Sequence, residues 1–121
     1  MAANRLFKMF AALTNTLTTN ILNPAAAGSG TGYTPTASYI TITHIRIVNK
    51  TSSDATFSLW VGATGANAAG TEFMGTGYTV PANSAVDWYG RLRLDSSDYL
   101  VGGASASTTL TINIEGEIGL A

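Results

Sequence analysis

The sequence contains one histidine, His44, placed between Thr43 and Ile45. Nucleophilic and acid–base catalysis need a histidine or paired carboxylates held close to a reacting group. A lone histidine within a strand is more often a hydrogen-bonded surface or interface residue, although a symmetry axis could bring copies of it together. The sequence therefore predicts that the chain is not an enzyme, and it predicts no cofactor.

Two pairs of acidic residues have spacings that invite comparison with known kinds of site. Asp95 and Asp98 flank two serines, and Glu115 and Glu117 share one face of the last predicted strand. A calcium site or a glycosidase dyad needs further groups at set positions, and neither pair has them. We interpret the pairs as a turn and a solvated strand face, so the sequence predicts no metal. The absence of cysteine also removes thiolate chemistry.

Three aromatic residues, Trp60, Trp88 and Tyr89, are suited to stacking against a sugar ring. In a strand at 55–61, Trp60 points away from the face that carries Phe57 and Leu59, which predicts that Trp60 is exposed. A strand tryptophan is, however, often buried between sheets or in a subunit interface. Carbohydrate binding and protein binding both stay open at this point.

The composition favours a protein that packs among other proteins. Only 11% of the 121 residues are charged, against about 25% in an average soluble domain. Thr, Ser, Asn and Gly solvate the surface instead, and they add no charge that an interface must desolvate. The net charge is −1 and the basic residues are scattered, so nucleic acid is not an expected partner. No apolar run is long enough to span a bilayer, so no membrane is expected either.

The pattern along the chain is that of short strands separated by Gly, Pro, Asn and Ser turns. Residues 1–12 have a loosely helical apolar spacing and predict an arm or a short helix. Residues 23–38 and 62–70 predict long loops, the first a candidate contact segment. Within 39–49 the apolar parity switches near His44, which predicts a β-bulge or a strand buried on both faces. The predicted strands are 13–22, 39–49, 55–61, 78–80, 85–94, 99–101 and 108–118.

These elements predict an all-β fold, a single antiparallel β-sandwich of jelly-roll-like type. Residues 1–12 form an N-terminal arm in this interpretation, and residues 13–121 form the sandwich domain. The predicted core is made by the inward faces of several strands, and its members are Ile45, Phe57, Leu59, Leu110 and Ile112.

Several segments resemble small virion structural proteins of tailed bacteriophages. They are 45–51 (IRIVNKT), 55–62 (ATFSLWVG), 78–84 (YTVPANS), 98–100 (DYL) after Leu94, 104–106 (ASA) and 110–117 (LTINIEGE). The resemblance covers roughly residues 38 to 118. It implies a β-sandwich subunit that decorates or cements a capsid, often as a trimer at a symmetry axis. The segment from Leu6 to Leu13 does not match the pattern.

The sequence therefore predicts a capsid decoration protein that binds the major capsid protein, or other virion proteins, as a homo-oligomer, with a trimer favoured. Its predicted location is the virion, on the capsid surface, after assembly in the host cytoplasm. A tail, neck or fibre component is an alternative, and a carbohydrate-binding module is another. The candidate contact residues are Arg5, Leu6, Phe7, Phe10, Tyr33 and Trp60.

Overall fold

A computed structural model describes residues 5–67, 70–74 and 77–119. All their regular structure is β-strand, which confirms the predicted all-β class. None of the described residues forms a helix long and apolar enough to cross a membrane. The strands are β1 (Arg5–Ala12), β2 (Asn20–Leu22), β3 (Tyr39–Asn49), β4 (Ala55–Gly62), β5 (Tyr78–Val80), β6 (Ser84–Asp95), β7 (Tyr99–Ala104) and β8 (Leu110–Gly119).

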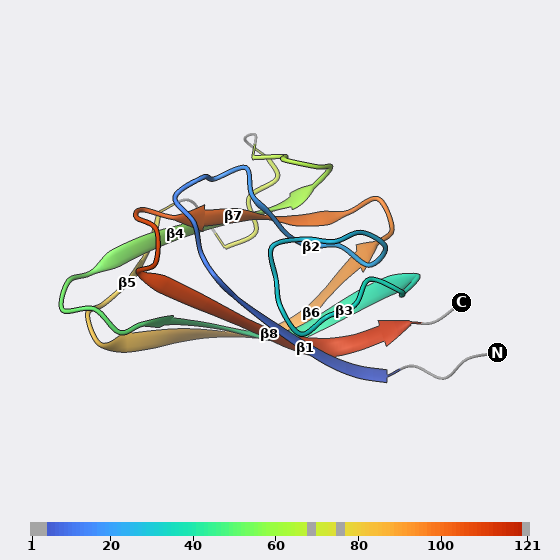
Figure 1. The fold of residues 1–121 in the computed structure, drawn as a ribbon, viewed down its shortest axis with the longest axis horizontal. Helices are drawn as coiled ribbons and strands as arrows, with labels where there is room; N and C mark the ends of the chain where they lie inside the picture. The colour runs from blue at the N-terminus through green and yellow to red at the C-terminus, as the bar shows by residue number, and fades with distance from the viewer. Residues whose placement is uncertain (1–4, 68–69, 75–76, 120–121) are drawn as a thin grey trace.

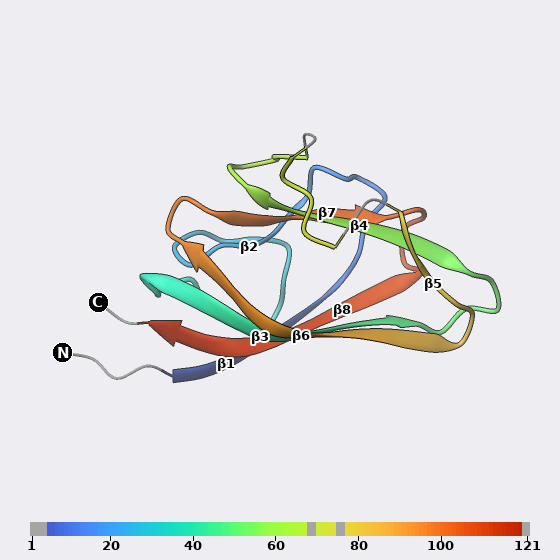
Figure 2. The same cartoon turned by 180° about the vertical axis from the view of Figure 1, so that it is seen from behind.

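The strands form two four-stranded antiparallel sheets, with the orders β1-β8-β3-β6 and β2-β7-β4-β5. The sheets lie as opposed layers, and the chain crosses between them several times (Figures 1 and 2). This arrangement confirms the predicted β-sandwich. Each sheet has one apolar side, and this side is buried only when the other sheet packs against it.

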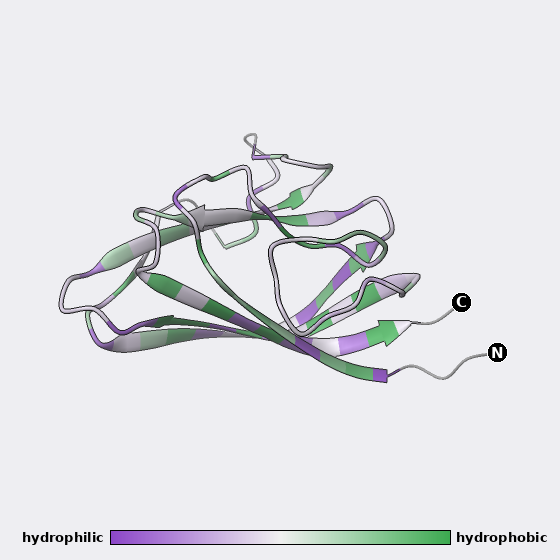
Figure 3. Ribbon diagram, in the orientation of Figure 1, coloured by the Kyte–Doolittle hydropathy of each residue, from purple (hydrophilic) through white to green (hydrophobic). Residues whose placement is uncertain are grey.

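The core lies between the sheets and is built by alternation along each strand. In β8, Leu110, Ile112 and Ile114 are buried, and the residues between them are exposed; Figure 3 shows this as alternating bands along the ribbon. Full burial of one such side chain stabilises the folded state by about 1.5–3 kcal/mol relative to leaving it exposed. The predicted core residues are confirmed, since Ile45, Phe57, Leu59, Leu110 and Ile112 are all at most 1% exposed.

The predicted bulge in β3 is also confirmed. The register of β3 against both β6 and β8 shifts between Ile42 and His44. Ile40 and Ile42 before the shift and Ile45 and Ile47 after it are all buried. The extra residue reverses the parity of the strand, so both halves of β3 turn isoleucines inward. His44 is thereby placed on the outer side of the sheet.

The prediction of an arm or short helix at residues 1–12 is wrong for Arg5–Ala12, which form the edge strand β1 in continuous register with β8. Met9 and Ala11 face the core and are 1% and 6% exposed. The predicted boundary between residues 12 and 13 therefore cuts through the sandwich. Apolar residues on both faces of β1 imitate helical spacing, and pairing with β8 decides in favour of a strand. Residues 1–4 lie outside the described residues.

The strand predicted at 13–22 is much shorter in the structure, where β2 covers only Asn20–Leu22. Threonine hydroxyls organise the preceding turn, because Oγ1 of Thr19 donates to the carbonyl of Thr16 at 2.7 Å and contacts Oγ1 of Thr14 at 2.8 Å. Such side-chain bonds compete with strand pairing. The segment still follows β7, whose Gly102 and Ala104 amides donate to the carbonyls of Thr19 and Thr14.

The predicted loop at 23–38 is irregular, as expected, but it is tied to the sandwich. Asn23 is 1% exposed, and its Nδ2 donates to the carbonyls of Ser96 and Asp98 at 3.0 and 2.8 Å. Thr31 exchanges two backbone hydrogen bonds with Phe10 of β1. The loop therefore packs along the open side of β1 instead of extending into solvent.

Candidate protein-binding face

The sheet β1-β8-β3-β6 has one side turned away from the core, which we call the outer face. Its side chains come from alternate residues of four strands. The ladder places Phe10, Asn113, Arg46 and Asp87 in one row across the sheet, and Lys8, Glu115, His44 and Tyr89 in the next row. Neighbouring strands bring these residues within reach of one another.

His44 lies at the centre of a polar network on this face. Its Nε2 is 2.7 Å from Oδ1 of Asp87, and its Nδ1 is 3.0 Å from Oε1 of Glu115. Ionised carboxylates only accept hydrogen bonds, so the imidazolium form, in which both ring nitrogens donate, satisfies both contacts at once. The hydrogen bond with Asp87 raises the pKa of His44 above its ordinary value, burial opposes this, and Glu115 adds to the increase.

Arg46 completes the network by binding the same aspartate. Its Nε and Nη2 donate to Oδ1 and Oδ2 of Asp87 at 2.8 and 3.3 Å. These bonds, followed by the one from His44, lower the pKa of Asp87. The ring of Tyr89 stacks on His44, and Tyr89 is 71% exposed. Each cation has a carboxylate partner, so the network is close to neutral although it consists mainly of charged groups.

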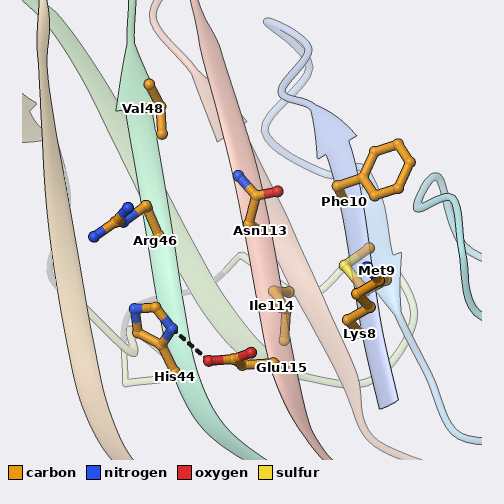
Figure 4. A pocket seen from close by; sticks show the side chains of 9 residues that line it. All are labelled: Lys8, Met9, Phe10, His44, Arg46, Val48, Asn113, Ile114 and Glu115. Carbon is orange, nitrogen blue, oxygen red and sulfur yellow. Dashed lines mark hydrogen bonds and ion pairs between the residues drawn. The ribbon is translucent and has the colours of Figure 1, made fainter.

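A shallow groove of about 480 Å³ runs across the outer face beside the network. The aromatic ring of Phe10 lies on one side, and the polar side chains of Asn113, Arg46 and His44 lie on the other (Figure 4). Lys8 and Glu115 contribute a further cation and anion to its lining. The groove offers an apolar surface next to hydrogen-bond donors and acceptors in fixed positions, a combination that suits a protein interface.

The network does not have the geometry of a metal or catalytic site. Asp87 and Glu115 contact opposite nitrogens of the His44 ring, so the three groups do not converge on one point. Within residues 5–67, 70–74 and 77–119, no group of three His, Asp or Glu side chains is arranged to hold a metal ion. The groove also holds no serine or threonine beside His44 that the ring could activate.

The structure separates the predicted contact residues. Leu6 and Phe10 share the outer face and are 84% and 46% exposed, and Arg5 is exposed where β1 begins. Phe7 is half-buried and meets Tyr33 edge to face at 5.6 Å between centroids. The Tyr33 hydroxyl donates to the carbonyl of Pro24 at 2.6 Å, so Phe7 and Tyr33 make internal contacts.

The expectation that Trp60 is exposed is wrong, because this residue is only 4% exposed. The chain after β4 folds back over the outside of the second sheet (Figure 1). There Gly65 donates to Oδ1 of Asn20 at 2.8 Å, and Glu72 forms a bridge with Trp60. A sugar-stacking site on Trp60 is therefore ruled out by burial. Trp88 is half-buried against Phe73, which leaves Tyr89 as the exposed aromatic residue of the three.

Sequence reasoning missed the network around His44. Alternation against the isoleucines does place His44 and Arg46 on one face of β3. It gives no indication that β6 and β8 flank β3, and the carboxylates come from those two strands. No protein-family model matches the sequence, and no curated protein is significantly similar to it.

Proposed function

We propose that this chain is a non-enzymatic structural protein of a bacteriophage virion, which decorates the capsid as a homo-oligomer by binding capsid protein through its outer face. The observation that carries the proposal is the pair Leu6 and Phe10, exposed on a sheet face where His44 and Arg46 already bind Asp87. Large apolar side chains beside satisfied polar groups favour burial against another protein.

The fold supports a jelly-roll-like assignment within this proposal. The orders β1-β8-β3-β6 and β2-β7-β4-β5 are compatible with eight strands wound as two Greek keys. Jelly rolls occur in viral capsid domains as well as in lectins, so the fold alone does not assign a function. It agrees with the function implied by the resemblance of residues 38–118 to phage virion proteins.

Charge pairing explains how the outer face could be buried at modest cost. Burial of an unpaired charge is strongly unfavourable, whereas Asp87 already accepts hydrogen bonds from both His44 and Arg46. Arg and aromatic residues are also enriched in interface cores. A tail, neck or fibre component would use the same features and would bind purified tails instead of shells.

Co-sedimentation with purified empty shells, and separately with purified tails, of the phage that encodes the chain tests the proposal. We expect the protein to pellet with shells and Leu6→Asp to weaken this binding by at least tenfold. Leu17→Asp is the matched control, because Leu17 is 37% exposed and lines a hollow with residues of β4 and β7 in the other sheet. Unchanged binding of Leu6→Asp would exclude the outer face. Binding to tails alone would replace the capsid assignment.

A further inference from the structure

Strand β6 forms one edge of the sheet, and among the described residues it pairs only with β3. The directions in which the amides and carbonyls of β6 point can be worked out from β1, at the other edge of the sheet. There the amide and carbonyl of Phe10 point away from β8 and bond with Thr31. In antiparallel ladders, bonding directions alternate from residue to residue and continue from strand to strand. This alternation turns the amides and carbonyls of Val86 and Trp88 toward β3, and those of Asp87 and Tyr89 toward the open edge.

The open edge of β6 is long, and the register of β6 against β3 shifts once along it, between Tyr89 and Leu92. The residues whose amides and carbonyls point outward are Ala85, Asp87, Tyr89, Arg91 and Arg93. In the part of the chain that the structure describes, no backbone hydrogen bond outside the β3 ladder involves them. At the opposite edge of the sheet, Thr31 already covers part of β1. Figure 2 shows β6 at the near edge of its sheet. An unpaired edge of this kind is a template for another strand.

We propose that the β6 strands of two copies pair antiparallel about a twofold axis at Gly90 and join the two four-stranded sheets into one sheet of eight strands. This inference deepens the homo-oligomer part of the proposed function and rests on it. In this register Tyr89 stands opposite Arg91 of the partner subunit, and Asp87 stands opposite Arg93 of the partner subunit. The same contact is made twice, as twofold symmetry requires.

Charge complementarity selects this register. It sets an anion against a cation at Asp87 and Arg93, and it sets Arg91 against the exposed ring of Tyr89, where a cation–π contact forms. A shift of two residues in one direction would place Arg91 opposite Arg91 of the partner subunit. A shift in the other direction would place Arg91 opposite Asp87 of the partner subunit, but it would leave Arg93 opposite Ala85 of the partner subunit. Of the three registers, the chosen one gives both arginines a favourable neighbour and sets no like charges opposite each other.

The inner side of β6 supports the same pairing. Trp88 and Leu92 are half-buried at the open edge. The register places Trp88 opposite Leu92 of the partner subunit, and Leu92 opposite Trp88 of the partner subunit. Gly90, at the axis, has no side chain, and a Cβ there would lie 2.7 Å from the Trp88 ring. The two rings can therefore lie over the axis and cover apolar surface that one copy leaves partly exposed.

The contact gives a dimer, in contrast to the trimer that the resemblance implies. Both outer faces then lie on the same side of one continuous sheet, each with its own Leu6 and Phe10. Two binding faces on one rigid body raise the effective concentration of the second face once the first has bound. The dimer would therefore bind a repetitive protein surface more tightly than a single copy.

Light scattering of the wild-type chain and two proline variants tests the pairing. Arg91→Pro removes an outward amide from β6, and Lys8→Pro, the matched control, removes an outward amide from β1 at the other edge. We expect the wild type and Lys8→Pro to have twice the chain mass, and Arg91→Pro to have the mass of one chain. Near-ultraviolet circular dichroism checks that each variant is folded. A wild-type monomer or trimer, or a folded dimeric Arg91→Pro, would overturn the proposal.

Disulfide trapping tests the register, since the chain contains no cysteine of its own. Ala85→Cys and Asp95→Cys face each other across the proposed contact, at a Cα separation of about 5.5 Å that a disulfide can span. We expect oxidation to link the two variants when they are mixed, and neither variant with itself. Linkage of Ala85→Cys to Arg93→Cys instead would contradict the register. A dimer that ignores shells would leave this contact intact and refute the proposed function alone.

Discussion

The ring of Tyr89 lies flat on the imidazole of His44, with centroids 4.5 Å apart and planes inclined by 7°. The two residues stand directly opposite each other in the β3–β6 ladder. Asp87 and Glu115 contact the two nitrogens of the same imidazole. One ring is thus held by two carboxylates at its edge and by an aromatic face, and all three contacts favour its charged form.

The first prediction is that stability falls as the pH rises through the raised pKa of His44. In the unfolded chain that pKa is near 6.5, and the hydrogen bond to Asp87 is the main reason that it is higher in the folded chain. The stabilisation is therefore fully present below about 6.5 and is lost as the pH passes the folded value. Urea unfolding from about pH 5.5 to 9 measures this effect.

His44→Gln provides the control for the pH experiment, because it keeps a polar side chain and removes the titration. The difference in unfolding free energy between wild type and variant should shrink with increasing pH. Asp87 does not interfere, since its pKa is lowered from 3.8 and its contribution is lost only as the pH falls through that lowered value. A difference that stays constant across the range would show that His44 is not charged in the folded protein.

The second prediction is that β1 is essential to the sandwich. Met9→Ala removes a side chain that is 1% exposed, and we expect it to lower the unfolding free energy by about 2–5 kcal/mol. Lys8→Ala, at the exposed neighbouring position, should change it by less than about 0.5 kcal/mol. Deletion of residues 1–12 should destabilise the fold severely, because it uncovers β8. A truncated chain with wild-type stability would show that β1 is dispensable.

The parts of the fold that were predicted from the sequence depend on local signals. Alternation of Leu110, Ile112 and Ile114 with polar residues identified β8 and its inward face. Ile42 and Ile45 have opposite parity along the strand, and this identified the bulge. Both isoleucines are expected to face the one core, which an uninterrupted strand would not allow. These inferences needed no knowledge of which strands are neighbours.

The parts that were not predicted depend on contacts between distant segments. The carboxylates that contact His44 lie 43 and 71 residues away in the sequence. Trp60 is buried because a later segment packs outside its sheet, and alternation within β4 carries no information about that segment. The apolar spacing of β1 fits a helix and a strand alike until β8 supplies a partner.

The third prediction concerns the turn between β7 and β8, where Thr108 has a backbone φ of 64°. A β-branched residue is strained in this left-handed region, whereas asparagine tolerates it, as Asn83 does at a φ of 54°. We expect Thr108→Asn to raise the unfolding free energy by about 0.5–1 kcal/mol. Thr111→Asn is the control in the neighbouring strand and should not stabilise. A loss of stability in Thr108→Asn would mean that the hydroxyl of Thr108 matters more than the strain.

The fourth prediction concerns Asn49, which ends β3 and is fully buried. Its Nδ2 donates to the carbonyls of Ser53 and Val80 at 2.9 and 3.0 Å, and its Oδ1 accepts from the amide and hydroxyl of Thr51. A carboxylate at this position would face two carbonyls without a proton to donate, so Asn49→Asp should lower the unfolding free energy by at least about 2 kcal/mol. Asn113→Asp, on the exposed side of β8, is the control and should change it by less than about 0.5 kcal/mol. Equal urea midpoints for the two variants would show that the buried amide does not fix the end of β3.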